Sequence, residues 1–177
     1  MICIIAIHKF RTVFQMIRNS AKIGEVGEMH IVAHAGEEGP PSYILEALDG
    51  IHAERIDHGV QCLKDPALVH RLRMEHIPLT VCPLSNLRLQ VFNRLEDHKL
   101  KQMLDLGLNV SIHSDDPAYF GGYINDNYRC VVDALNLDEN DVMKLAKNAI
   151  NSAFLTDRDK DILLRRLSLE SKPFLHK

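Results

Sequence analysis

The chain has 177 residues, of which 46% are hydrophobic and 25% charged, as in an ordinary globular protein with a packed core. Its net charge is -3 and its lysines and arginines are scattered, so we expect no nucleic-acid partner and no membrane surface as a partner. The four cysteines form no CxxC pair, which predicts buried thiols in the reducing cytoplasm. We therefore expect residues 1–177 to form a single domain whose partner is a small molecule.

Apolar runs alternate with helical periodicity along the chain. A strand is expected at 1–7 and a helix at 10–21, and the chain ends in helices that begin near 138 and 157. Between them, the strands are expected at 29–34, 53–58, 77–82 and 108–113, the helices near 40–48, 66–75 and 100–106, and an irregular stretch at 84–97. Strands that alternate with helices across short loops predict an α/β protein with parallel strands.

Polar side chains follow the first of these internal strands. His34 ends the strand and Glu37 comes three residues later, after Gly36, whose conformational freedom lets the backbone bend toward the same point. An imidazole is a zinc ligand, and a carboxylate beside it can move protons. The pattern predicts His34 as a metal ligand and Glu37 as a proton shuttle, although a His-x-x-Glu pair on its own is common by chance.

Two further strands end in residues of the same kind. His58 can polarise an attacking water, the alternative being a histidine that only packs in the core. Asp115 and Asp116 point to opposite sides of an extended chain, so one can bind metal while the other faces a substrate; a simple Asp-Asp-Pro turn is the alternative. His113 shares a strand face with Asp115, which predicts a place beneath the same site, the alternative being a histidine that only packs or faces the surface.

Four blocks, in order, resemble the adenosine/adenine deaminase family of metal-dependent hydrolases: HAGEEGPP at 34–41, ERIDHG at 54–59, CPLSN at 82–86 and SDDPAYFGGY at 114–123. The resemblance covers about 10–155, and the longer blocks look closer to adenine deaminases. It implies a (β/α)8 TIM-type barrel with the active site at the carboxyl ends of its strands. Four or five strands cannot close that barrel, so we expect only its C-terminal part here.

The resemblance also implies a reaction and the residues that perform it. His34 and Asp115 would hold one Zn2+, Glu37 would protonate the purine ring nitrogen next to C6, and His58 would orient the attacking hydroxide. Water would add at C6 and ammonia would leave, converting adenine to hypoxanthine in purine salvage.

Asp116 and the backbone N–H of Gly36 would bind the purine. The chain departs from the family twice: it has no H-x-H pair, which supplies two further zinc ligands in the family, and it has His113 where the family usually has Asn. The alternatives are an adenosine deaminase, or a non-catalytic fragment without those ligands. The open edges of such a half-barrel would favour self-association.

Overall fold

The computed structural model describes residues 12, 13, 16 and 30–171. The strand expected at 1–7 and most of the helix expected at 10–21 lie outside these residues. Internal packing divides the chain into two compact units: unit 1 is Met1–Leu79 and unit 2 is Thr80–Lys177.

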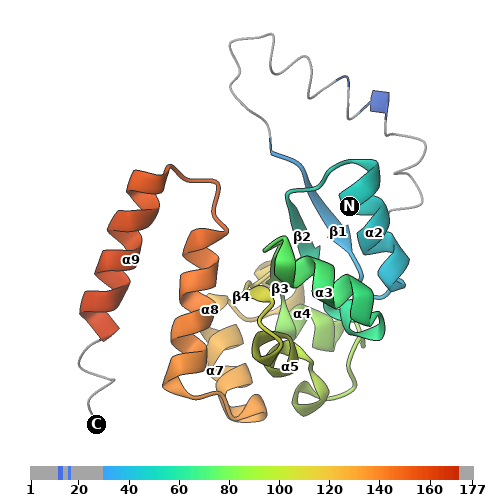
Figure 1. Cartoon of the computed structure of the whole chain (residues 1–177). Coiled ribbons are helices and arrows are strands. Elements are labelled where there is room, and N and C mark those ends of the chain that lie inside the picture. Colours follow the sequence, from blue (N-terminus) through green and yellow to red (C-terminus); the bar gives the residue numbers. More distant parts are fainter. Residues whose placement is uncertain (1–11, 14–15, 17–29, 172–177) are drawn as a thin grey trace. The chain divides into compact units, whose positions relative to one another are not determined.

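The elements of unit 1, in chain order, are β1 (Val32–Ala35), α2 (Pro41–Gly50), β2 (Arg55–His58), η2 (Val60–Lys64) and α3 (Pro66–Met74). Helix α2 packs on the parallel pair of β1 and β2 and on η2, and α3 packs on η2 (Figure 1). In the register of β1 with β2, His34 lies opposite Asp57 and Ala35 lies opposite His58. Parallel strands end on the same edge, so this register brings the two histidines to one end of the pair.

Proline explains where both helices of unit 1 begin. Pro41 and Pro66 occupy the first helical position, where the missing N–H would have had no helical partner. Asp65 caps α3, because its carboxylate accepts hydrogen bonds from the N–H groups of Ala67 and Leu68 at 3.0 and 3.1 Å. Apolar side chains from both helices and β2 fill the core of the unit: Ile44, Ala47, Leu48, Ile56, Leu68 and Leu72.

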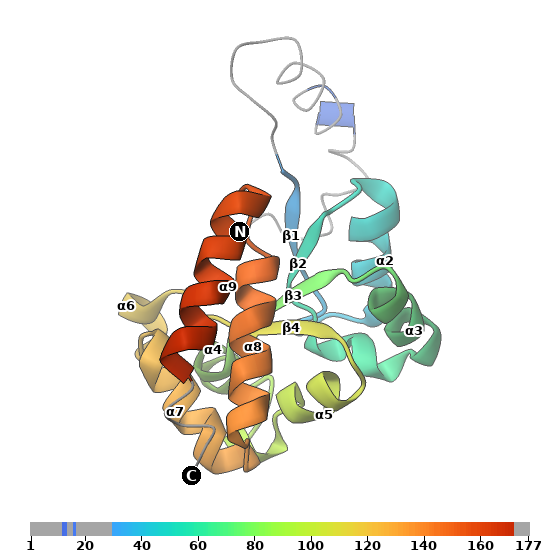
Figure 2. The same cartoon turned by 60° about the vertical axis from the view of Figure 1, so that its left-hand side comes forward.

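Unit 2 is mainly helical. Its elements are α4 (Pro83–Arg88), η3 (Leu95–Asp97), α5 (Leu100–Asp105), β4 (Asn109–Ile112), α6 (Pro117–Phe120), α7 (Ile124–Leu135), α8 (Glu139–Asn151) and α9 (Asp157–Ser171). Helix α8 packs on β4, and α9 packs on α8 (Figure 2). Strand β3 (Pro78–Val81) spans the boundary of the units, and the strand order in the described residues is β1-β2-β3-β4.

The four internal strands and the helices expected at 40–48, 66–75 and 100–106 are confirmed, with ends that differ by a few residues. The expectation of an irregular stretch at 84–97 is wrong in part, because α4 and η3 lie there. Helix α4 carries polar side chains inward, Ser85 and Asn86 being fully buried, so it has no apolar stripe for a sequence pattern to detect. Helix α7, between two expected segments, was also not anticipated.

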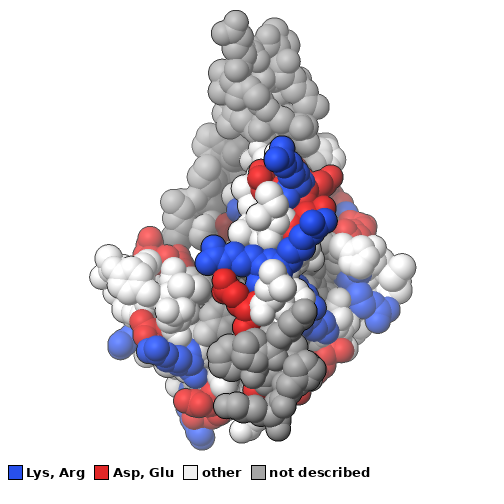
Figure 3. Space-filling model, turned by 90° about the vertical axis from the view of Figure 1, so that its left-hand side faces the viewer, with Lys and Arg blue, Asp and Glu red and all other residues white. Residues whose placement is uncertain are grey.

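None of the helices that the described residues form is long and apolar enough to cross a membrane. On the face drawn in Figure 3, lysine and arginine side chains lie among aspartate and glutamate side chains. Helix α9 shows the same mixture, with Arg166 donating to Glu170 one helical turn away at 2.8 Å.

His98 is a buried polar anchor in the core of unit 2. Its Nδ1 accepts the N–H of Leu100 at 3.0 Å, so its Nε2 carries the proton and donates to Asn86 Oδ1 at 3.2 Å. Burial, helped by the positive charge of Lys99, lowers the pKa of His98 to about 4. A second ring proton would also confront the Leu100 N–H, which is itself a donor.

The pKa of His98 lies below that of an unfolded histidine, so protons bind the unfolded chain more tightly at this site. We expect the free energy of unfolding to fall as pH drops from about 6.5 to 4, by at most ~1.4 kcal/mol per pH unit from this residue. Denaturant unfolding at several pH values should show this component in the native chain and not in His98→Gln. His70→Gln, at an exposed position of α3, is the control; equal slopes for all three chains would contradict the assignment.

Candidate functional site

Two histidines meet at the carboxyl ends of β1 and β2. His34 Nδ1 lies 3.1 Å from His58 Nε2, a hydrogen bond, and the ring centroids are 5.1 Å apart. The side chain of His58 is 1% exposed, whereas that of His34 is 48% exposed. One imidazole is therefore held in the core, and its partner reaches the surface.

Carboxylates flank this pair on both sides. Glu37 Oε1 lies 3.3 Å from His58 Nδ1, and Asp57 Oδ2 lies 3.6 Å from His34 Nε2. With Glu37 ionised, His58 donates its Nδ1 proton to that carboxylate and accepts the Nδ1 proton of His34 at Nε2. Glu37, His58 and His34 can exchange protons across the two shorter contacts, which is the chemistry of a general acid and base, whereas Asp57 lies beyond hydrogen-bond distance of His34 Nε2.

The loop after β1 is held in place by backbone hydrogen bonds. Gln61 donates from its backbone N–H to Gly36 O at 2.8 Å and from Nε2 to Glu37 O at 2.9 Å. Gly36 has φ +65°, a strained conformation for other residues, and a Cβ there would lie 2.5 Å from Ile44 Cδ1, so a larger residue would also force the Ile44 side chain to move. His58 itself has φ +69°. This left-handed conformation is uncommon outside glycine and clusters at functional sites.

Unit 2 carries a second group, at the end of β4. Asp115 has φ +54°, and its Oδ2 accepts a 2.6 Å hydrogen bond from Ser85 Oγ. Asp116, the next residue, is exposed, and its backbone carbonyl accepts the N–H groups of Tyr119 and Phe120 to start α6. Adjacent carboxylates therefore have different surroundings, one braced by a buried hydroxyl and one open to solvent.

His113 is joined to its own strand and to β3. Its Nε2 lies 2.9 Å from Ser111 Oγ, and its backbone N–H donates to Val81 O at 2.8 Å. The side chain is partly buried. A place for His113 beneath a metal site stays a prediction.

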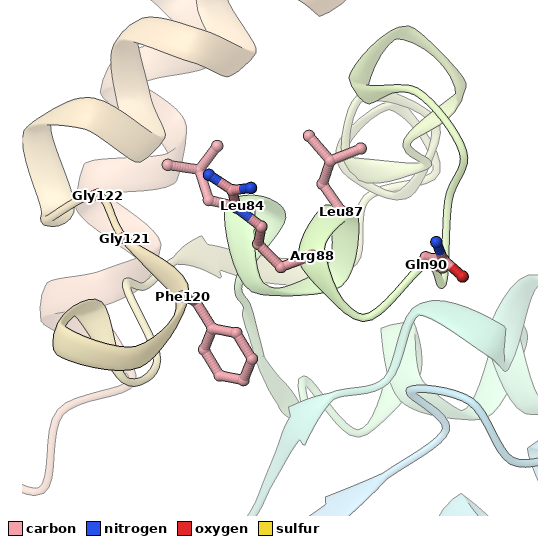
Figure 4. Close-up of a pocket in the computed structure, with 7 residues that line it drawn as sticks. All are labelled: Leu84, Leu87, Arg88, Gln90, Phe120, Gly121 and Gly122. Atoms are coloured by element: carbon pink, nitrogen blue, oxygen red, sulfur yellow. The ribbon is translucent and has the colours of Figure 1, made fainter.

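A hollow of about 420 Å3 opens between α4 and the segment after α6. Its lining combines leucine side chains, a guanidinium, an amide, an aromatic ring and two glycines, as Figure 4 shows: Leu84, Leu87, Arg88, Gln90, Phe120, Gly121 and Gly122. The segments that line it follow directly after Cys82 and after Asp116. The hollow therefore belongs to the same segments that carry Ser85 and the adjacent carboxylates.

The structure brings four of the predicted site residues together in unit 1: His34, Gly36, Glu37 and His58. The other two, Asp115 and Asp116, are neighbours in unit 2. Asp57, Gln61 and Ser85 were not predicted to have roles. Asp57 and Ser85 lie inside the ERIDHG and CPLSN blocks, and their place in those family-like motifs could have marked them as candidates. Nothing in the sequence distinguishes Gln61.

The relatives found by sequence and those found by structure include proteins of the same name. A chain named adenine deaminase from Cupriavidus taiwanensis is 54% identical over 152 residues, which cover 86% of this chain and 41% of that one. The crystal structure of an adenine deaminase from Arthrobacter aurescens matches with a TM-score of 0.87 at 46% identity, over 94% of this chain and 49% of the other. The chain thus spans somewhat less than half the length of these relatives.

A Burkholderia ambifaria amidohydrolase structure with bound Zn shares the fold, with a TM-score of 0.74 at 23% identity, over 90% of this chain and 46% of that one. The likeness to the Arthrobacter structure confirms the expected parallel α/β fold of the TIM-barrel type, of which this chain holds a part. The family described as adenosine deaminase matches residues 7–169. Because that match takes in nearly the whole sequence, the chain belongs to the adenosine deaminase family.

Proposed function

We propose that residues 1–177 supply, as a single domain, the C-terminal part of a zinc-dependent enzyme that converts adenine and water to hypoxanthine and ammonia. The observation that carries the proposal is the row of Glu37, His58 and His34, linked at 3.3 and 3.1 Å where two parallel strands end. The identity to chains named adenine deaminase supports adenine as the substrate. The thiols of Cys62, Cys82 and Cys130 support a reducing, cytoplasmic setting.

The donor chemistry suits Zn2+, which takes imidazole nitrogen and carboxylate oxygen as ligands. We propose His34 and Asp115 as the two ligands from this chain. The sequence has no H-x-H pair. We propose that the further ligands come from a polypeptide segment equivalent to the part of the relatives that this chain does not match. When bound, such an ion supplies a hydroxide nucleophile near neutral pH, because it lowers the pKa of water.

The chain's own residues handle the protons. Protonated Glu37 donates to the ring nitrogen next to C6. His58 orients the oxygen that bonds to C6 through its Nε2, which must first give up its contact with His34 Nδ1. Water loses two protons in becoming the C6 oxygen. One passes through His58 and restores the Glu37 acid, and the other goes to the amino nitrogen, so the C6–N bond breaks and ammonia departs. Asp116 follows Asp115 directly and is exposed. It binds the purine together with the backbone N–H of Gly36.

The enzyme to test is a chimera that joins this chain to the part of the Cupriavidus taiwanensis adenine deaminase that it does not match. In this chimera we expect Glu37→Gln to lower kcat by about 10²–10⁴, because the amide cannot deliver a proton. Zinc content should be unchanged. Glu38→Gln, at the exposed neighbouring position, is the control and should keep its turnover. Unchanged turnover in Glu37→Gln would exclude the proton-shuttle role.

The two adjacent carboxylates should separate metal binding from purine binding. We expect Asp115→Ala to lose stoichiometric zinc, since it removes a ligand. Asp116→Ala should keep zinc and raise KM for adenine. Metal analysis of the purified chimeras, with initial rates on the same samples, makes the comparison. Full zinc in Asp115→Ala would remove that residue from the ligand set.

Rates of ammonia release from adenine and from adenosine, measured separately on the same chimera, distinguish the free base from the nucleoside as substrate. We expect the chimera to release ammonia from adenine with a higher kcat/KM than from adenosine. Faster release from adenosine would favour the alternative, an adenosine deaminase. A folded chimera that holds zinc and turns over neither compound would contradict the proposed function.

A further inference from the structure

Ser85 lies in the CPLSN block, for which the proposed mechanism has no use. It is a residue of α4, its side chain is fully buried, and its Oγ donates a 2.6 Å hydrogen bond to Asp115 Oδ2. Hydroxyl donors come this close when the acceptor is an ionised carboxylate. The contact joins CPLSN to SDDPAYFGGY within unit 2, across 30 residues of sequence.

From this contact we propose that Ser85 is a positioning residue: its hydroxyl fixes the orientation in which the Asp115 carboxylate binds the metal ion. The inference rests on the proposed function, which makes Asp115 a ligand. Carboxylate ligands generally depend on a hydrogen-bond donor behind them, because a carboxylate on a freely rotating side chain spends little time in the binding orientation.

The backbone conformation of Asp115 shows why its side chain needs a stabilising hydrogen bond. Its φ of +54° belongs to the left-handed region, which residues other than glycine seldom adopt. This conformation, directly after β4, persists only where the surroundings stabilise it. A buried hydroxyl that binds the side chain stabilises both the conformation and the direction of the carboxylate.

Ser85 can act as a brace because its own helix is anchored. Asn127, fully buried in α7, accepts the N–H of Leu84 at Oδ1 over 3.1 Å and donates from Nδ2 to Tyr123 O at 3.1 Å. One amide side chain therefore ties the first turn of α4 to the start of α7. The serine hydroxyl is held by a fixed helix rather than by a mobile loop.

A buried serine can also be purely structural, and the chain contains a comparison. Ser152, after α8, is buried and donates from Oγ to Asn109 Oδ1 at 3.4 Å. Asn109 begins β4, whereas Asp115 follows the end of that strand. Ser152→Ala therefore removes a buried hydroxyl from the same unit at the opposite end of the same strand.

The first measurement is the zinc dissociation constant of the chimera by competition with a chelator. We expect Ser85→Ala, which removes the hydroxyl donor, to raise the constant about 10- to 100-fold. Ser152→Ala should leave it within about twofold. Native-like zinc binding in Ser85→Ala, or an equal loss in Ser152→Ala, would overturn the inference.

The second measurement needs no metal. In the 177-residue chain, the unfolding equilibrium constants of Ser85→Ala, Asp115→Ala and the double variant should show coupling by a factor of about ten. Additive effects would mean that the hydroxyl does not hold the carboxylate, which would overturn the inference. A native chimera that binds no zinc would instead contradict the role of Asp115 itself, and the inference would fail with it.

Discussion

The parallel register of β1 with β2 is the constraint on which the group of candidate site residues in unit 1 depends. It sets His34 opposite Asp57 and Ala35 opposite His58, so that both imidazoles emerge at one edge. A slip by one residue would turn every side chain of a strand to the other face. Buried Ala35 and Ile56 oppose that slip, because it would expose them. Core packing in this way determines which nitrogen atoms can share a proton.

Both groups of candidate site residues include backbone that is unfavourable by itself. His58 at φ +69° and Asp115 at φ +54° each cost on the order of 1–2 kcal/mol relative to ordinary conformations. In unit 1 the His58 side chain is held by its contacts with Glu37 and His34, and in unit 2 the Asp115 carboxylate is held by the hydroxyl of Ser85. When neighbouring groups stabilise a strained backbone conformation, they also keep the side chain in one orientation. A reactive or ligand-binding group requires such a fixed orientation.

Burial of polar groups is also what concealed part of the fold. In helix α4 the polar side chains of Ser85 and Asn86 are buried, and Asn86 accepts a hydrogen bond from the buried ring of His98. The sequence of this segment is therefore polar and suggests an irregular loop, although the segment is helical and internal. Periodicity methods assume that inward positions are apolar. They succeeded for α2, α3 and α5, whose inward positions are leucine, isoleucine, methionine and alanine.

The sequence by itself determined the alternation of strands and helices, the starts of helices at proline, and the family, because these depend on local composition and on short motifs. It also identified His34, Glu37, His58, Asp115 and Asp116 as candidates, since each stands where a strand gives way to a loop. Only the tertiary structure decided that Glu37 contacts His58 and that Ser85 braces Asp115. Those contacts join residues far apart in the chain, or residues whose side-chain directions depend on left-handed backbone, and neither spacing nor propensity encodes them.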